Sequence, residues 1–170
     1  MRGCARARVA VAGLCLIAPA IAAGGPPPGV RSAFRAPVVR RVAPVALRAM
    51  APFVGRALRR TWAVASRVTP EVVDGYVRPL RTKGTAEALV EMTLAEPQPV
   101  DLVDRLEGLQ VPSLVIAGVA DPVVREADAQ LVADALRTDL VVIDDAGHLP
   151  HEEQPEETLE HLRRLLASVV

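Results

Sequence analysis

The stretch "VPSLVIAGVADPVV", residues 111–124, decides the fold that we predict for this chain. Its apolar run does not alternate with polar residues, which is typical of a strand buried in a parallel sheet covered on both faces. A second run of this kind, "DLVVIDD", occupies residues 139–145, and the segment between them, 126–137, has the apolar spacing of a helix. Strand, helix and strand in this order predict parallel strands joined by a right-handed crossover.

The C-terminal segment continues this pattern with another helix. Pro155 stands at the expected first helical position, and glutamates on either side of it favour the positive end of a helix dipole. We expect the buried stripe of this helix to consist of Leu159, Leu162, Leu165, Leu166 and Val169.

The N-terminal segment, residues 1–23, allows two interpretations. Its apolar run "VAGLCLIA", residues 11–18, ends at Pro19 and can be a third buried strand. Residues 12–18, 112–117 and 139–143 would then be neighbouring parallel strands. Alternatively, Arg2, Arg6 and Arg8, the apolar run and a small-x-small sequence at 20–22 make up a secretory signal peptide. The strand predicts a cytoplasmic protein, and the signal peptide predicts a secreted one.

Residues 24–107 have the pattern of short helices. Pro37, Pro44 and Pro52 interrupt a sequence rich in Val, Ala, Leu and Arg, as proline does where it begins or breaks a helix. Thr69 as N-cap and Pro70 at the first helical position predict a further helix. We therefore expect residues 31–106 to be mostly helical and free of strands.

Composition limits the classes of partner. The 170 residues suffice for one domain with a sizeable core, and the net charge of zero hides a division along the chain. Residues 1–70 hold twelve arginines and no acid, whereas residues 71–170 hold all twenty acids. A membrane-surface or nucleic-acid patch on residues 31–60 would need its arginines on one continuous face, which three prolines disfavour. We therefore expect neither nucleic-acid binding nor stable membrane insertion. The N-terminal apolar run is also too short to be expected to span a bilayer.

Two predicted strands each deliver a reactive side chain at the carboxyl end. Asp121 follows the strand at 112–117, and His148 follows the strand at 139–143. Reactive groups of open parallel sheets collect at this edge, and a histidine that acts as a general base needs a carboxylate on its other ring nitrogen. We predict that Asp121 and His148 form such a pair, with hydrogen-bond separation between carboxylate and ring. Asp121 before a proline is also typical of a simple turn.

Metal binding is not expected from the histidines. His148, His151 and His161 match neither H-E-x-x-H nor H-x-x-E-H, and Pro150 disturbs the helix that would align them. His151 fits a helix start better than a second catalytic position. The two cysteines, Cys4 and Cys15, have no metal-ligand spacing and are expected to be free thiols. The sequence therefore predicts no metal and no cofactor.

At these residues the chain resembles the lid-bearing members of the α/β-hydrolase family. "VPSLVIAGVADPVV" is similar to the strand that carries the triad acid, here Asp121, and "DAGHLPHEEQPEE" to the final strand end with the triad histidine, here His148. The resemblance implies a partial α/β-hydrolase fold of about three parallel strands with flanking helices. It assigns residues 1–23 to a core strand, 24–107 to a helical lid and 108–170 to the C-terminal part of the core.

The chain departs from the family pattern at the nucleophile. No G-x-S-x-G elbow occurs in the sequence, so no nucleophile can be carried over, and its type, Ser or Asp, stays open. Without it we expect no turnover by this chain alone, and Ser32 and Cys15 are the first alternatives to test.

The resemblance implies hydrolysis of an ester or similar bond of a small-molecule substrate, with only the acid and base of a nucleophile-His-Asp triad present. The alternative is a catalytically inactive remnant or binding module of the same fold. The expected lid contains every aromatic residue of the chain, and each can line a substrate pocket or pack in a core. They are Phe34, Phe53, Trp62 and Tyr76.

Overall fold

Three strands form one parallel sheet in the computed structural model, which describes residues 11–20, 28–94 and 102–169. They are β1 (Leu14–Ile17), β2 (Ser113–Gly118) and β3 (Leu140–Ile143), in the order β1-β2-β3. Leu16 pairs with Val115, and Ile116 pairs with Val141. This arrangement confirms the prediction of three neighbouring parallel strands.

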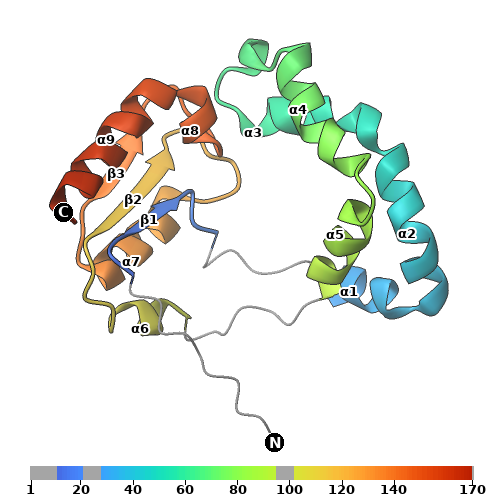
Figure 1. The fold of residues 1–170 in the computed structure, drawn as a ribbon, viewed down its shortest axis with the longest axis horizontal. Coiled ribbons are helices and arrows are strands. Elements are labelled where there is room, and N and C mark those ends of the chain that lie inside the picture. The colour runs from blue at the N-terminus through green and yellow to red at the C-terminus, as the bar shows by residue number, and fades with distance from the viewer. Residues whose placement is uncertain (1–10, 21–27, 95–101, 170) are drawn as a thin grey trace, which may run out of the picture.

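Helices cover both faces of the sheet (Figure 1). On one face, α7 (Glu126–Leu136) packs Val132 and Leu136 against Val115 of the central strand. On the other, α9 (Pro155–Ser168) contributes Leu165 to a cluster that contains Ile116. Because successive residues of β2 point to opposite faces and each face is covered, its apolar run does not alternate. The chain is therefore an α/β protein with helices on both sides of a parallel sheet.

The predicted buried stripe of α9 is wrong at two positions. Leu159 is 42% exposed and Leu166 is 53% exposed, while Leu165 packs against the sheet. The sheet that the structure describes has only three strands and ends at β1, so it is too narrow to cover the whole apolar side of a 14-residue helix.

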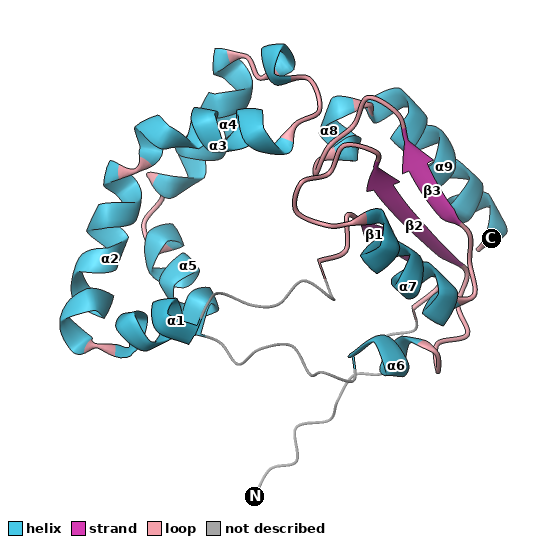
Figure 2. Ribbon diagram, turned by 180° about the vertical axis from the view of Figure 1, so that it is seen from behind, coloured by secondary structure: helices cyan, strands magenta, loops and turns pink. Residues whose placement is uncertain are grey.

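Residues 28–94 form an arc of short helices beside the sheet, referred to below as the helical region (Figures 1 and 2). The described residues between 31 and 106 are mostly helical and contain no strand, as predicted. Residues 95–101 lie outside what the structure describes. The elements of the arc are α1 (Pro28–Arg35), α2 (Pro37–Ala49), η1 (Ala51–Phe53), α3 (Val54–Thr61), η2 (Ala65–Arg67), α4 (Pro70–Leu80) and α5 (Thr85–Leu94).

Local signals explain some of these helix bounds and fail at one. The hydroxyl of Thr69 accepts a hydrogen bond from the Val72 amide at 3.4 Å, and Pro70 takes the first helical position of α4. Pro37 begins α2 in the same way, but Pro44 lies inside α2 without ending it. The expectation that Pro44 interrupts the helix is therefore wrong, and α2 has a continuous face from Pro37 to Ala49.

Two short helices complete the α/β part. They are α6 (Leu102–Leu106), which packs Leu106 into the α7 side of the core, and α8 (Pro150–Glu153), which follows the β3 loop. None of the helices in the described part of the chain is both long and apolar enough to cross a bilayer.

Candidate active site

The carboxylate of Asp121 is held by the turn that follows β2. Its Oδ1 accepts hydrogen bonds from the amides of Val123 at 2.7 Å and Val124 at 3.0 Å. These two bonds form the turn expected of an Asp-Pro sequence, and they leave Oδ2 available. The Asp121 side chain is only 1% exposed, so its charge is shielded from water. The turn uses only Oδ1 of Asp121, so forming it does not prevent Oδ2 from binding a second partner.

The imidazole of His148 meets the other oxygen of Asp121. Nδ1 of His148 lies 2.9 Å from Oδ2 of Asp121, within the predicted hydrogen-bond range. The His148 side chain is 27% exposed, and no described residue is bonded to Nε2. With the carboxylate at Nδ1, the proton of the neutral ring sits on Nδ1 and Nε2 carries the free lone pair. The ring is thus oriented to accept a proton at Nε2.

Glu153 holds the loop that carries His148. Its Oε1 accepts hydrogen bonds from the Gly147 amide at 2.8 Å and the Leu149 amide at 3.3 Å, on either side of the histidine. Its Oε2 accepts from the Ala63 amide in the helical region at 2.7 Å. Glu153 is 5% exposed, and the three amides supply the partners that a buried carboxylate needs. Nothing in the sequence distinguishes this residue from the neighbouring exposed glutamates.

Two glycines allow the backbones at this edge to approach closely. A Cβ on Gly147 would lie 2.2 Å from the carbonyl oxygen of Thr61, and a Cβ on Gly118 would lie 2.1 Å from the carbonyl oxygen of Gly147. The His148 amide also donates to the Thr61 carbonyl at 2.8 Å. Gly147 is therefore required by this contact, and the left-handed turn in the loop is taken by Asp145, with φ of 52°.

The helical region packs against the loop with apolar side chains as well. Leu149, next to His148, contacts a buried cluster of Leu58, Trp62 and Val68. The indole Nε1 of Trp62 is buried and has no hydrogen-bond partner in the described structure. Packing and hydrogen bonding together fix the end of α3 beside His148.

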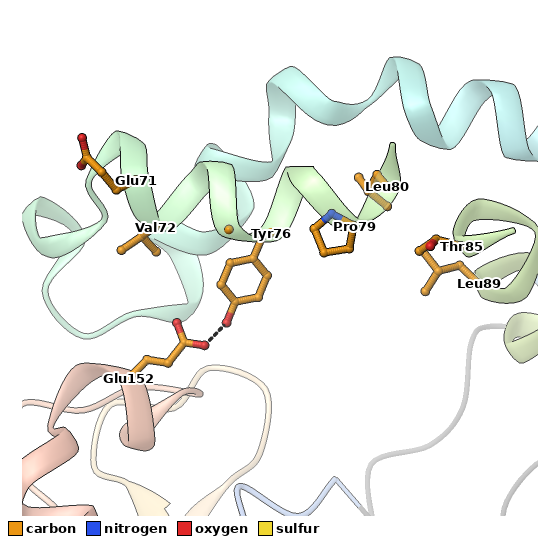
Figure 3. Close-up of a pocket in the computed structure, with 9 residues that line it drawn as sticks. Glu71, Val72, Tyr76, Pro79, Leu80, Thr85, Leu89 and Glu152 are labelled. Atoms are coloured by element: carbon orange, nitrogen blue, oxygen red, sulfur yellow. Dashed lines mark hydrogen bonds between the residues drawn. The ribbon is translucent and has the colours of Figure 1, made fainter. Parts of the chain in front are cut away.

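A cavity of about 600 Å³ lies between the helical region and α8 (Figure 3). Tyr76 of α4 points from the helical region toward Glu152 of α8, and its hydroxyl donates a hydrogen bond to that carboxylate. Burial, the hydrogen bond from its hydroxyl to Glu152 and the charge of Glu152 all raise the pKa of Tyr76. The rest of the lining is mostly apolar and consists of Val72, Gly75, Pro79, Leu80 and Leu89, with Glu71 and Thr85.

The four aromatic residues proposed for a substrate pocket have different environments. Tyr76 lines the cavity, whereas Trp62 packs in the buried cluster beside the His148 loop. Phe53 is exposed in η1. Phe34 belongs to α1, and its side chain lies outside what the structure describes.

The alternative nucleophiles have no contact with His148 in the described structure. Ser32 is exposed in α1, and Cys15 is half-buried in β1, where it faces the α9 side of the sheet. Burial raises the pKa of the Cys15 thiol, which disfavours the reactive thiolate. The described residues also contain no group of three His, Cys, Asp or Glu side chains placed to hold a metal ion.

Comparisons with known proteins identify the family of the chain. The model of the alpha/beta hydrolase family matches residues 2–161, and the chain therefore belongs to this family. It is 32% identical over 90 residues to 3-oxoadipate enol-lactonase 2 of Acinetobacter baylyi, covering 52% of this chain and 32% of that protein. It is 30% identical over 69 residues to 3-oxoadipate enol-lactonase 1 of the same organism, covering 41% of this chain and 26% of that protein.

Among solved structures, the chain is similar to a thermophilic esterase from Thermogutta terrifontis. The TM-score is 0.66 at 29% sequence identity, and the match covers 93% of this chain and 56% of the esterase. The chain thus spans about half the length of that enzyme and matches a third or less of each lactonase. These matches establish the family of the chain.

Proposed function

We propose that this chain supplies the acid and base of an α/β-hydrolase triad that cleaves an ester or lactone bond of a small molecule. The observation that carries the proposal is the 2.9 Å contact between Nδ1 of His148 and Oδ2 of Asp121, with Nε2 bonded to no described residue. Two lactonases and an esterase among the similar proteins support this class of bond.

In the proposed reaction His148 acts first as a base and then as an acid. If the nucleophile is a serine, Nε2 takes its proton as the hydroxyl oxygen attacks the carbonyl carbon, and Asp121 stabilises the imidazolium that forms. The same proton then passes to the leaving alkoxide oxygen when the ester C–O bond breaks. Water then attacks the acyl intermediate while Nε2 takes a proton from the water. That proton passes to the serine oxygen as its bond to the acyl carbon breaks, which releases the acid and returns His148 to its neutral form. Asp121 stays ionised throughout.

The helical region serves as the lid of this site. The proposal is supported by the contacts of this region with the loop of His148, through the Thr61 carbonyl and the Ala63 amide, and by the cavity between α4 and Glu152 of α8. The apolar walls suit the acyl or alkyl part of a neutral ester, while Glu152 supplies the polar end of the cavity.

A second candidate function is a non-catalytic module of the same fold. The observation that favours it is the sequence itself, which contains no G-x-S-x-G motif in its 170 residues. Without a nucleophile and backbone oxyanion donors, His148 and Asp121 transfer a proton but form no acyl intermediate.

The test is hydrolysis of 4-nitrophenyl acetate by the longest in-frame product of the gene, compared with its His148→Ala and Asp121→Asn variants. A triad predicts a loss of roughly 10³-fold to 10⁶-fold in kcat for His148→Ala. The 170-residue chain should show no turnover. A gene without in-frame G-x-S-x-G sequence, or a rate unchanged in both variants, supports the non-catalytic module instead.

A further inference from the structure

We propose that the outward side of α2 docks on an anionic phospholipid bilayer. This surface, called the α2 face, consists of Val38, Val42, Val45 and Arg41 of α2 together with Arg35, the last residue of α1. The valines contact the acyl region and the two arginines contact lipid phosphates. This inference is independent of the proposed catalytic function, because it uses none of the residues around His148.

The α2 face is an apolar stripe that the described structure leaves uncovered. Val38, Val42 and Val45 have the i, i+4, i+7 spacing of one helix side, and their exposed fractions are 74%, 55% and 64%. Three large aliphatic side chains so exposed on consecutive turns indicate an interaction surface. The continuity of α2 through Pro44 makes this stripe possible.

The opposite side of α2 is occupied by α5. Arg40 pairs with Glu91, and Arg48 pairs with Glu87 at 2.9 Å, both across the α2–α5 contact. Each of the two acids of α5 is therefore paired with an arginine of α2. Figure 1 shows α2 on the outer edge of the arc, away from the sheet. A planar surface can therefore approach α2 without contacting the sheet.

Arginines at the end of α1 and in the first turns of α2 provide the charge that an anionic headgroup needs. A hollow of about 480 Å³ is lined by Arg35, Pro37, Arg40, Arg41 and Glu91. Glu91 is paired with Arg40, whereas Arg35 and Arg41 have no ion-pair partner among the described residues. One acid among three arginines leaves two positive charges, and the guanidinium fork matches phosphate oxygens.

The combination of valines and unpaired arginines favours a bilayer over other anionic partners. A nucleic acid would neutralise the arginines but leave the aliphatic stripe in water, because valine offers bases no stacking surface. A bilayer receives both groups, since an interfacial helix buries its apolar side among acyl chains while basic residues contact headgroups. The absence of acids from residues 1–70 removes repulsion from the rest of α2 and α3.

The test is co-sedimentation of the full 170-residue chain with sucrose-loaded vesicles. We expect binding to phosphatidylcholine vesicles that contain 30% phosphatidylglycerol, weaker binding to pure phosphatidylcholine, and a decrease with added salt. Arg35→Glu together with Arg41→Glu should weaken binding by about 25-fold or more, about five-fold for each basic residue removed. Val42→Asp should weaken it by at least about five-fold, because a carboxylate replaces an apolar group at the bilayer surface.

Matched controls distinguish a specific effect of the α2 face on vesicle binding from a general effect of surface charge or hydrophobicity. Arg105→Glu with Arg163→Glu makes the same charge change on the α/β part, and Leu131→Asp changes an exposed apolar residue of α7. Both controls should bind like the parent chain, and circular dichroism should show unchanged helix content in all variants. Equal binding to neutral and anionic vesicles, or unchanged binding by Val42→Asp, would overturn the proposal. Self-association that Val42→Asp abolishes, without vesicle binding, would identify a second copy as the partner and also overturn it.

Discussion

The backbone amide of Ala63 donates a hydrogen bond of 2.7 Å to Oε2 of Glu153, a residue 90 positions later in the chain. The other oxygen of the same carboxylate accepts from the amide of Gly147 at 2.8 Å. One buried side chain thus joins the end of α3 to the loop that carries His148. The position of the helical region and the orientation of the histidine depend on the same group, and this dependence can be tested without an activity assay.

Glu153→Gln should destabilise the chain by about 2 kcal/mol, because an amide has one acceptor oxygen and its NH2 group opposes a backbone donor. The measurement is urea unfolding followed by circular dichroism. Glu156→Gln, at an exposed position in the first turn of α9, is the control and should change stability by less than about 0.5 kcal/mol. Equal effects of the two substitutions would show that Glu153 does not hold the loop.

Gly147→Ala should disrupt the contact between the helical region and the loop of His148. The new Cβ would lie 2.2 Å from the Thr61 carbonyl oxygen and 2.9 Å from the Ala63 amide nitrogen, so backbone must move. We expect the free energy of unfolding to fall by at least about 2 kcal/mol. We also expect faster amide hydrogen exchange at residues 61–63. Gly75→Ala is the matched control, since its Cβ would meet nothing within 4 Å and alanine favours a helix. A Gly147→Ala variant as stable as Gly75→Ala would contradict this geometry.

Asp121→Asn should remove the preference of the His148 ring for a proton on Nδ1. The carboxylate oxygen at 2.9 Å fixes that tautomer, whereas an asparagine amide offers either an oxygen or an NH2 group. Nitrogen-15 NMR of the imidazole reports the tautomer directly in the 170-residue chain. We expect a protonated Nδ1 in the parent chain and a mixture of tautomers in the variant. Asp144→Asn, an exposed neighbour of the loop, should leave the spectrum unchanged.

Tyr76 should ionise at a pH well above 10 in the folded chain. Burial and the hydrogen bond to Glu152 raise its pKa, and it is the only tyrosine, so absorbance at 295 nm reports it alone. The folded pKa is higher than the unfolded one, so this stability contribution is complete below pH 10 and is lost as pH rises through the folded pKa. Glu152→Gln should lower the midpoint toward 10. A parent midpoint at 10 would show that Tyr76 is open to water.

Much of the fold follows from sequence because its signals are local. Three non-alternating apolar runs predict buried parallel strands, and the predicted strands overlap β1, β2 and β3. Parallel strands end at a common edge, which predicts that Asp121 and His148 meet there. Nδ1 of His148 does lie 2.9 Å from Oδ2 of Asp121. Thr69 and Pro70 begin α4 as predicted, because capping depends only on neighbouring residues.

Tertiary structure decided the remaining features, because each of them depends on which elements contact each other. Glu152, Glu153, Glu156 and Glu157 look alike in sequence, yet burial and three backbone donors single out Glu153. Packing likewise places Trp62 in an apolar cluster and Tyr76 in the wall of a cavity. Leu159 and Leu166 have the spacing of a buried stripe but stay exposed, because the described sheet does not extend beneath them. Apolar periodicity determines which side of a helix can be buried, and only the neighbouring elements determine whether it is.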